Sequence, residues 1–446
     1  MAEIARGTDV GSSAALRRGI GLPVAAALVV GGTVGVGIFL TPAGMARTLA
    51  SPALLLLVWT FIGGTALCGA LCFGELSARF PEAGGGYVYL REAYGPVWAF
   101  LYGWKCLLVM DPGLAAALAT GLGVYVQAMA PGISPKAVAL CAIVAVAIAN
   151  IGGVRLAAGI GNLLAVVKIG LLLFLVLWGF LSGAGDVSHF VPFTARRPGA
   201  PPLLPALAGA LVSAFFSFGG WWETSRLAGE VREPQRTMPR ALALGVAAVT
   251  LLYVGVSAVF LYLVPPAAVS SSEAFAAQAG AALFGPRGGW ILSGIVALSV
   301  LGCLFAFMTA APRVYYAMAR DGVLPKLVAR TDPRTGAPIW AVAIQTALAC
   351  LLVALGTFDA IVAYFIFVTV VFLGLMVAGL FRIRKRTPPA GFSTPLYPLT
   401  AILFLATVAL VLALLAAGRP LEAGLGVAVV ALGLPVYYAF FRQRKV

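Results

Sequence analysis

Four ionisable side chains lie within long apolar stretches of the chain: Lys105, Asp111, Lys168 and Glu223. Insertion scales assign a charged residue at the centre of a membrane helix a cost of about 2.5 to 3.5 kcal/mol, so each is a functional candidate. At that depth a charge can pair with another charge, bind a proton or balance a charged ligand. No nucleophile, base and orienting residue and no spacing of metal ligands accompany them, so the sequence indicates neither an enzyme, a cofactor nor a metal site.

Two glycine-rich strings interrupt apolar stretches of the chain, GGTVGVGIF at 31–39 and FSFGGW at 216–221. Small residues there can serve close helix packing. The alternative is that each helix is broken, because unwound backbone persists at membrane depth only where it lines a cavity or a substrate. Helix N-termini at a break offer N–H groups to an anion, and freed carbonyls accept from a cation. A ligand that carries both groups close together, an α-amino acid, fits such a site.

The composition places these strings in a membrane. Hydrophobic residues make up 61% of the 446 residues and charged residues 10%, with a mean hydropathy of +1.02, whereas a soluble domain carries about 25% charged residues. The net charge of +15 resides mostly at the ends of apolar segments. These observations exclude a nucleic-acid binder, a soluble enzyme and a disulfide scaffold, and the six cysteines fall within apolar runs as small fillers.

A spanning helix needs about 20 mainly apolar residues, and the sequence predicts twelve such helices in an all-α membrane protein. Their limits are 20–46, 52–78, 93–129, 136–154, 160–183, 205–230, 240–264, 288–312, 338–356, 358–381, 396–417 and 421–441. The longest polar loops are expected at 185–204, 265–287 and 313–337. The short polar N-terminus has no apolar core ahead of a cleavage site, so we expect the first span not to be a removable signal peptide.

The basic residues predict the orientation, because short cytoplasmic loops are enriched in Lys and Arg. With the N-terminus inside, 22 of the 30 basic residues fall in the cytoplasm, six fall outside and two lie within spans. This ratio predicts a multi-pass protein of the cell membrane with a cytoplasmic N-tail, 1–19, and a cytoplasmic C-tail, 442–446. The four basic residues at 226–240 are counted here as cytoplasmic.

The two glycine strings lie five spans apart, and five is an odd number. A repeat of five spans returns in the opposite orientation, so spans 1 and 6 are expected to be inverted counterparts. Interrupted helices at corresponding positions of two halves indicate the binding site of a transporter. We expect a first repeat over 20–183, a second over 205–381 and two additional helices over 396–441.

Four motifs in register support this interpretation. They are GGTVGVGIF in span 1, FGELSARFPEAGGGYVYLREAYGP from span 2 into span 3, FSFGGWWETSRLAGEVREPQRTMPRA from span 6 into span 7, and RVYYAMARDGVLPKLVARTDPRTGAP after span 8. With them the sequence resembles the amino acid-polyamine-organocation superfamily of secondary transporters, near its bacterial amino acid permease and L-type transporter branch. The resemblance implies the five-plus-five inverted-repeat fold of the leucine transporter, with discontinuous helices 1 and 6 and two C-terminal helices.

The resemblance also implies a binding site built from main-chain groups of the two breaks. The substrate carboxylate is expected to meet the amides of Val36 and Gly37, with Thr33 and Gly35 beside them. The amino group is expected to meet the carbonyls of Val34, Phe216 and Ser217. Phe218 is expected to be an aromatic lid next to Gly219.

Lys168 corresponds to a family lysine in span 5, which implies that its ammonium binds span 1 carbonyls near Gly31 and Gly32 in place of a sodium ion. It is then either a proton-responsive group or a fixed positive charge. The alternative is that Lys168 snorkels to the interface, about 12 Å away.

Some of the remaining polar candidates leave two interpretations. Asp111 either forms a structural ion pair or binds a cationic substrate, and Lys105 is expected to find its partner on another helix. Glu223 follows the break in span 6 by about one turn and is a candidate counter-charge, whereas Glu230 and Glu233 are expected to form a network with arginines near the cytoplasmic end. Tyr253 either bonds the unwound part of span 1 or is satisfied elsewhere.

The leading functional hypothesis is a permease for L-amino acids, neutral ones first, that works by alternating access with proton symport or amino acid exchange. A carrier of cationic amino acids or polyamines that uses Asp111 or Glu223 is one alternative, and a membrane amino acid sensor is another. The expected partners are the substrate, the lipid bilayer and, for symport, protons. Neither nucleic acid nor an obligatory protein partner is indicated.

Overall fold

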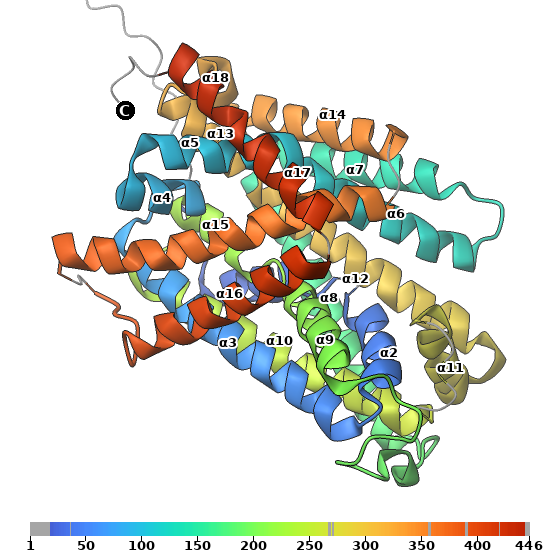
Figure 1. The fold of residues 1–446 in the computed structure, drawn as a ribbon. Helices are drawn as coiled ribbons and strands as arrows, with labels where there is room; N and C mark the ends of the chain where they lie inside the picture. The colour runs from blue at the N-terminus through green and yellow to red at the C-terminus, as the bar shows by residue number, and fades with distance from the viewer. Residues whose placement is uncertain are drawn as a thin grey trace, which may run out of the picture.

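The computed structural model describes residues 18–35, 37–265, 269, 272–355, 358–388, 391–418 and 420–441. Within these ranges the chain is helical and contains no strand, apart from an isolated bridge between Ile20 and Val231. The prediction of an all-α membrane protein is confirmed. Figure 1 shows the helices as one bundle, with the last helices of the chain along its outer side.

Nine helical segments of the described chain are long and apolar enough to cross a membrane. They are Pro52–Arg79 (α3), Pro96–Met129 (α5, a π-helical turn and α6), Gly159–Leu181 (within α8), Leu203–Glu230 (α9 and a 3-10 helix), Pro234–Leu263 (α10), Gln278–Arg320 (the end of α11, then α12 and α13), Ile366–Arg386 (within α15), Leu399–Gly418 (α16) and Ala423–Phe440 (most of α17, then α18). The pair α1 (Leu22–Thr33) and α2 (Gly37–Leu49) adds a tenth span, bent by 55° at its break. Two shorter apolar helices of 17 residues, α7 (Pro135–Ile151) and α14 (Ile339–Leu355), are also present, and the predicted count of twelve requires both of them.

Several predicted boundaries differ from the structure, and three of these differences follow from local features of the chain. The third span begins at Pro96, because Gly95 ends a separate short helix, α4 (Gly86–Tyr94), with a φ of 94°. The expected loop at 265–287 contains a helix, α11 (Ser272–Phe284). The eighth span continues past 312 as α13 (Pro312–Arg320), which a proline at its first position allows.

The broken first span lies at the centre of the bundle. Its first half, α1, packs against α8 (Val154–Leu181), α10 and α12 (Gly288–Ala310), and its second half, α2, packs against α9 (Leu203–Ser217) and α11. The helices α16 and α17 (Pro420–Ala431) cover α15 (Phe358–Arg386) from outside (Figure 1). The first and sixth spans are therefore surrounded by the helices that position their breaks.

Ion pairs connect the ends of several helices. Arg91 lies 2.9 Å from Asp321, and the buried Glu75 binds both Arg79 and Arg384. Because these pairs connect segments separated by up to about 300 residues in the chain, they fix the ends of several helices to one another.

The contact between α3 and α10 depends on small residues. A Cβ added at Gly63 would lie 2.4 Å from Cγ2 of Thr250, whereas one at the neighbouring Gly64 would meet no atom within 4 Å. Gly63 faces the packed helix and Gly64 faces outward, so the two glycines form a matched pair.

We expect Gly63→Ala to lower the midpoint of thermal unfolding of the purified protein in detergent, because overpacking a helix contact costs about 1 to 3 kcal/mol. Gly64→Ala is the control and should leave the midpoint unchanged or slightly raised. Equal midpoints for the two variants would contradict the close packing of α3 on α10.

Candidate functional site

The first span is broken between Thr33 and Gly37. The backbone of Val34 is extended, with φ −74° and ψ 92°, and its N–H still donates to the carbonyl of Val30. Val36, a predicted ligand of the substrate carboxylate, lies outside the described residues. The last carbonyls of α1 and the first amides of α2 are thus left without helical partners.

The sixth span is broken directly after Ser217. Gly219 donates to the carbonyl of Phe216, Gly220 takes a φ of 116°, and the chain continues as a 3-10 helix, Trp221–Glu230. A positive φ is available to glycine without steric cost. The sequence prediction of an interruption at this glycine pair agrees with the backbone.

The two breaks touch each other, which explains their glycines. A Cβ at Gly220 would lie 2.4 Å from the carbonyl oxygen of Gly32, and a Cβ at Gly37 would lie 2.6 Å from Oγ of Ser217. The hydroxyls of Thr41 and Ser217 are also 2.9 Å apart. Side chains at these glycines would push the two helices apart.

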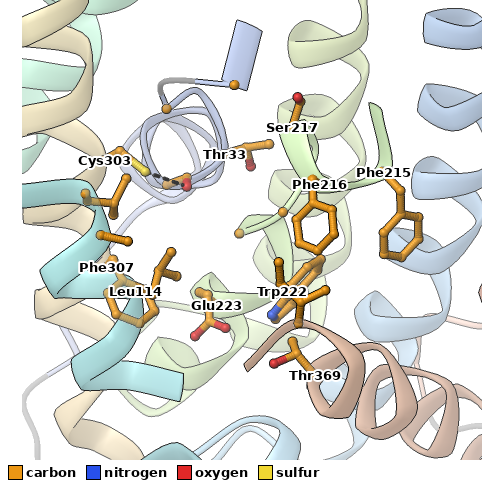
Figure 2. A pocket seen from close by; sticks show the side chains of 18 of the residues that line it. Thr33, Leu114, Phe215, Phe216, Ser217, Trp222, Glu223, Cys303, Phe307 and Thr369 are labelled. Carbon is orange, nitrogen blue, oxygen red and sulfur yellow. Dashed lines mark hydrogen bonds between the residues drawn. The ribbon is translucent and has the colours of Figure 1, made fainter. Parts of the chain in front are cut away.

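A cavity of about 470 Å³ lies beside the breaks (Figure 2). Its volume is in the range of small-molecule sites, about 300 to 1,000 Å³. Its walls come from the two broken spans and from α6 (Asp111–Met129), α12 and α15. The lining residues are Gly32, Thr33, Gly35, Gly37, Thr41, Met110, Leu114, Ala117, Leu118, Ser213, Phe215, Phe216, Ser217, Gly219, Gly220, Trp222, Glu223, Cys303, Phe307, Ile366, Thr369 and Val370.

Most of the predicted site residues line this cavity. They are Thr33, Gly35, Gly37, Phe216, Ser217, Gly219 and Glu223. Val34, Asp111, Phe218 and Tyr253 are not part of the lining. Phe307 and Leu114 also line the cavity, and their apolar side chains carry no signal in the sequence that separates a cavity wall from ordinary packing.

Phe218, predicted to be an aromatic lid, does not line the cavity. Its ring is buried against Trp59 and Tyr253, with ring centroids 6.0 and 5.0 Å away. The N–H of Phe218 donates to the carbonyl of Ala214, so the last turn of α9 still sets the direction of this ring. Figure 2 shows Phe216 and Trp222 at the cavity instead.

Lys168 lies behind the first break. Its Nζ donates to the carbonyl oxygens of Gly31, at 2.9 Å, and Val34, at 2.5 Å, and its side chain is 1% exposed. It therefore does not snorkel to the interface. The family resemblance implied that Lys168 binds carbonyls near Gly31 and Gly32. The carbonyl of Gly32 instead accepts from Sγ of Cys303 at 3.0 Å.

Tyr253 joins the two breaks. Its hydroxyl lies 3.1 Å from the carbonyl oxygen of Thr33 and 2.7 Å from that of Ser217. The carbonyls of Val34, Phe216 and Ser217, proposed for the substrate amino group, each already accept one hydrogen bond. Since a carbonyl has two lone pairs, one acceptor site remains on each.

Asp111 forms the structural ion pair that the sequence analysis considered. Both of its carboxylate oxygens accept from Nη1 of Arg226 at 3.0 Å, and Tyr315 donates to Oδ2. All three side chains are buried. Arg226 is thus not a cytoplasmic loop residue as counted from the sequence, because the 3-10 helix carries it back against α6.

Lys105 lies next to this pair. Its Nζ is 2.9 Å from Sδ of Met110 and 4.9 Å from the ring centroid of Tyr102. A π-helical turn, Cys106–Met110, separates Lys105 from Asp111 and adds a residue to the helix turn. No feature of the sequence predicts that turn.

An all-helical membrane protein whose two interrupted helices meet beside a cavity has the architecture of a secondary transporter. Residues 20–435 match the amino acid permease family, and the chain belongs to that family. The resemblance to the amino acid-polyamine-organocation superfamily is thereby confirmed.

Individual relatives cover nearly the whole chain. The serine/threonine exchanger SteT of Bacillus subtilis is 28% identical over 438 residues, which are 96% of this chain and 98% of that protein. The human large neutral amino acids transporter small subunit 2 is 28% identical over 96% of this chain and 81% of its own length. The mouse Asc-type amino acid transporter 1 is 27% identical over 96% of this chain and 83% of its own length.

We expect Lys168→Met to reduce amino acid uptake by purified protein in proteoliposomes about tenfold or more, because a hydrogen bond from a charged group contributes about 1.5 to 3 kcal/mol. Lys136→Met, which alters an exposed lysine on α7, is the control and should retain uptake. Full uptake activity of Lys168→Met would contradict the prediction that the Lys168 ammonium is required to hold the carbonyls of the first break.

Proposed function

We propose that this permease carries neutral L-amino acids by alternating access, in exchange for an internal amino acid. The observation that carries the proposal is the contact of the two helix breaks beside a cavity of about 470 Å³, with Lys168 on the carbonyls of the first break. The free main-chain N–H and C=O groups at the breaks can bind the carboxylate and the amino group that all amino acids share.

The charges around the cavity favour a neutral side chain in the substrate. Glu223 is the one charged residue among the described residues that line the cavity, and its Oε2 lies 2.7 Å from Nε of Arg226. Asp111, the other candidate counter-charge, is occupied by the same Arg226. A cationic side chain would therefore meet a carboxylate whose charge is already balanced.

Exchange is favoured over proton symport by one relative, which is named a serine/threonine exchanger. Lys168 supports the same choice, because an ammonium held by two carbonyls can serve as a fixed charge at the position where other transporters need a cation. The substrate-binding residues proposed for the main-chain contacts are Thr33, Val34, Gly35, Val36, Gly37, Phe216, Ser217 and Gly219.

The proposal includes the inverted repeat and a cytoplasmic location of both termini in the cell membrane. The described helices support the repeat, since each proposed half begins with a broken span, the α1–α2 pair in one and α9 with its 3-10 helix in the other. The ion-paired loops near Arg91, Asp321 and Arg384 lie on the side that the basic residues assign to the cytoplasm.

The test is uptake of radiolabelled amino acids into proteoliposomes that contain the purified chain alone. We expect uptake of neutral amino acids from liposomes preloaded with an unlabelled neutral amino acid, and little uptake into empty ones. Uptake driven by an inward proton gradient into empty liposomes would replace exchange by symport.

Binding of amino acids without uptake under either condition would contradict a transporter and favour a sensor. Uptake of lysine or arginine in preference to neutral substrates would favour the cationic alternative. Because the chain is purified alone, uptake also tests whether a second subunit is required.

A further inference from the structure

The carboxylate of Glu223 has an unusual position at the cavity. The side chain is 3% exposed and lines the cavity, and neither oxygen has a well-aligned hydrogen-bond donor among the described residues, although the Trp222 side chain lies beside the carboxylate. The apolar side chains of Leu114 and Phe307 and the indole of Trp222 surround it in Figure 2. A buried carboxylate without hydrogen bonds costs free energy, so a ligand that donates to it gains affinity.

The charge of Glu223 is nevertheless balanced. Nε of Arg226 lies 2.7 Å from Oε2, although the two groups are not aligned for a hydrogen bond. Arg226 is held in turn by Asp111 through both carboxylate oxygens and lies 3.3 Å from the hydroxyl of Tyr102. Lys105 adds a second buried cation to the same group.

This combination defines the kind of partner that Glu223 can accept. The group contains two acidic and two basic side chains, so a further full positive charge would gain little from it. An ionised carboxylate offers about four lone-pair sites, and these remain available to a neutral donor.

Glu223 also lies within reach of the helix breaks. It borders a second small hollow that Gly32 and Gly220 line, and its N–H donates to the carbonyl of Gly220. A substrate held by its main-chain groups at the breaks would direct its side chain toward this carboxylate.

We propose that Glu223 is a specificity-determining residue that accepts a hydrogen bond from a neutral donor in the substrate side chain. The transporter then prefers amino acids with a hydroxyl or carboxamide over aliphatic amino acids of the same size. This inference rests on the proposed transport of neutral amino acids and names the class of neutral substrate.

The experiment compares threonine with valine, which have the same shape and differ by the hydroxyl. In competition with a radiolabelled substrate, threonine should be about 10- to 100-fold more potent than valine with the unmodified protein. In Glu223→Met the ratio of threonine to valine potency should fall close to one. Threonine should compete more weakly, and the potency of valine should not change. Glu223→Gln, which keeps an acceptor oxygen, should restore part of the ratio.

The variant is expected to fold because Arg226 keeps Asp111 as its partner when Glu223 is replaced. Glu230→Gln is the matched control, since Glu230 is a buried acid of the same 3-10 helix that pairs with Arg313 and does not line the cavity. It should leave the threonine-to-valine ratio unchanged. If transport by Glu223→Met is too slow, the same ratio is measured as ligand-induced thermal stabilisation in detergent.

Three results would overturn the inference. The first is an equal threonine-to-valine ratio in the unmodified protein and in Glu223→Met. The second is strong competition by lysine that Glu223→Met abolishes, which would assign a counter-charge. The third is loss of pH dependence in Glu223→Met with the ratio intact, which would assign a proton site. Failure of the proposed function is distinguishable, because then no amino acid is transported by the unmodified protein.

Discussion

The structure depends on how the main-chain groups of two broken helices are satisfied inside a membrane. Lipid provides no hydrogen bonds, so each freed carbonyl needs a partner from the protein or a ligand. Lys168 from α8, Tyr253 from α10 and Cys303 from α12 supply those partners. The helices that pack around the first span therefore also supply the hydrogen-bond donors for its break. The packing of the bundle and the geometry of the site depend on the same side chains.

The breaks themselves follow from the sequence, because glycine pairs at mid-span are the residues that permit close contact and positive φ. The family, the all-α fold and the positions of both interruptions could be predicted from residue types and their order. Lys168 could be selected for the same reason, since an ammonium in an apolar run needs acceptors. These features depend on short sequence patterns or on single residues whose burial costs free energy. Such features can be predicted from the sequence alone.

Other features depend on contacts that the sequence does not encode locally. Gly220 takes a φ of 116°, and this single backbone angle redirects the side chains that follow, such as Trp221 and Trp222. The pairing of Arg226 with Asp111 joins residues 115 positions apart. The π-helical turn before Asp111 shifts the register by one residue, so helical wheels place Lys105 and Asp111 on separate faces although both contribute to one buried group.

Buried ion pairs are rarely retained for stability alone, because apolar residues of similar volume are often as stable or more so. Asp111 and Arg226 do not line the cavity, and their pair is nevertheless fully buried beside it. Asp111 balances the charge of Arg226 and fixes its position at that depth, and Arg226 in turn stabilises the carboxylate of Glu223 among apolar walls. We therefore interpret the Asp111–Arg226 pair as the structure that holds the carboxylate of Glu223, with its charge balanced, at the cavity.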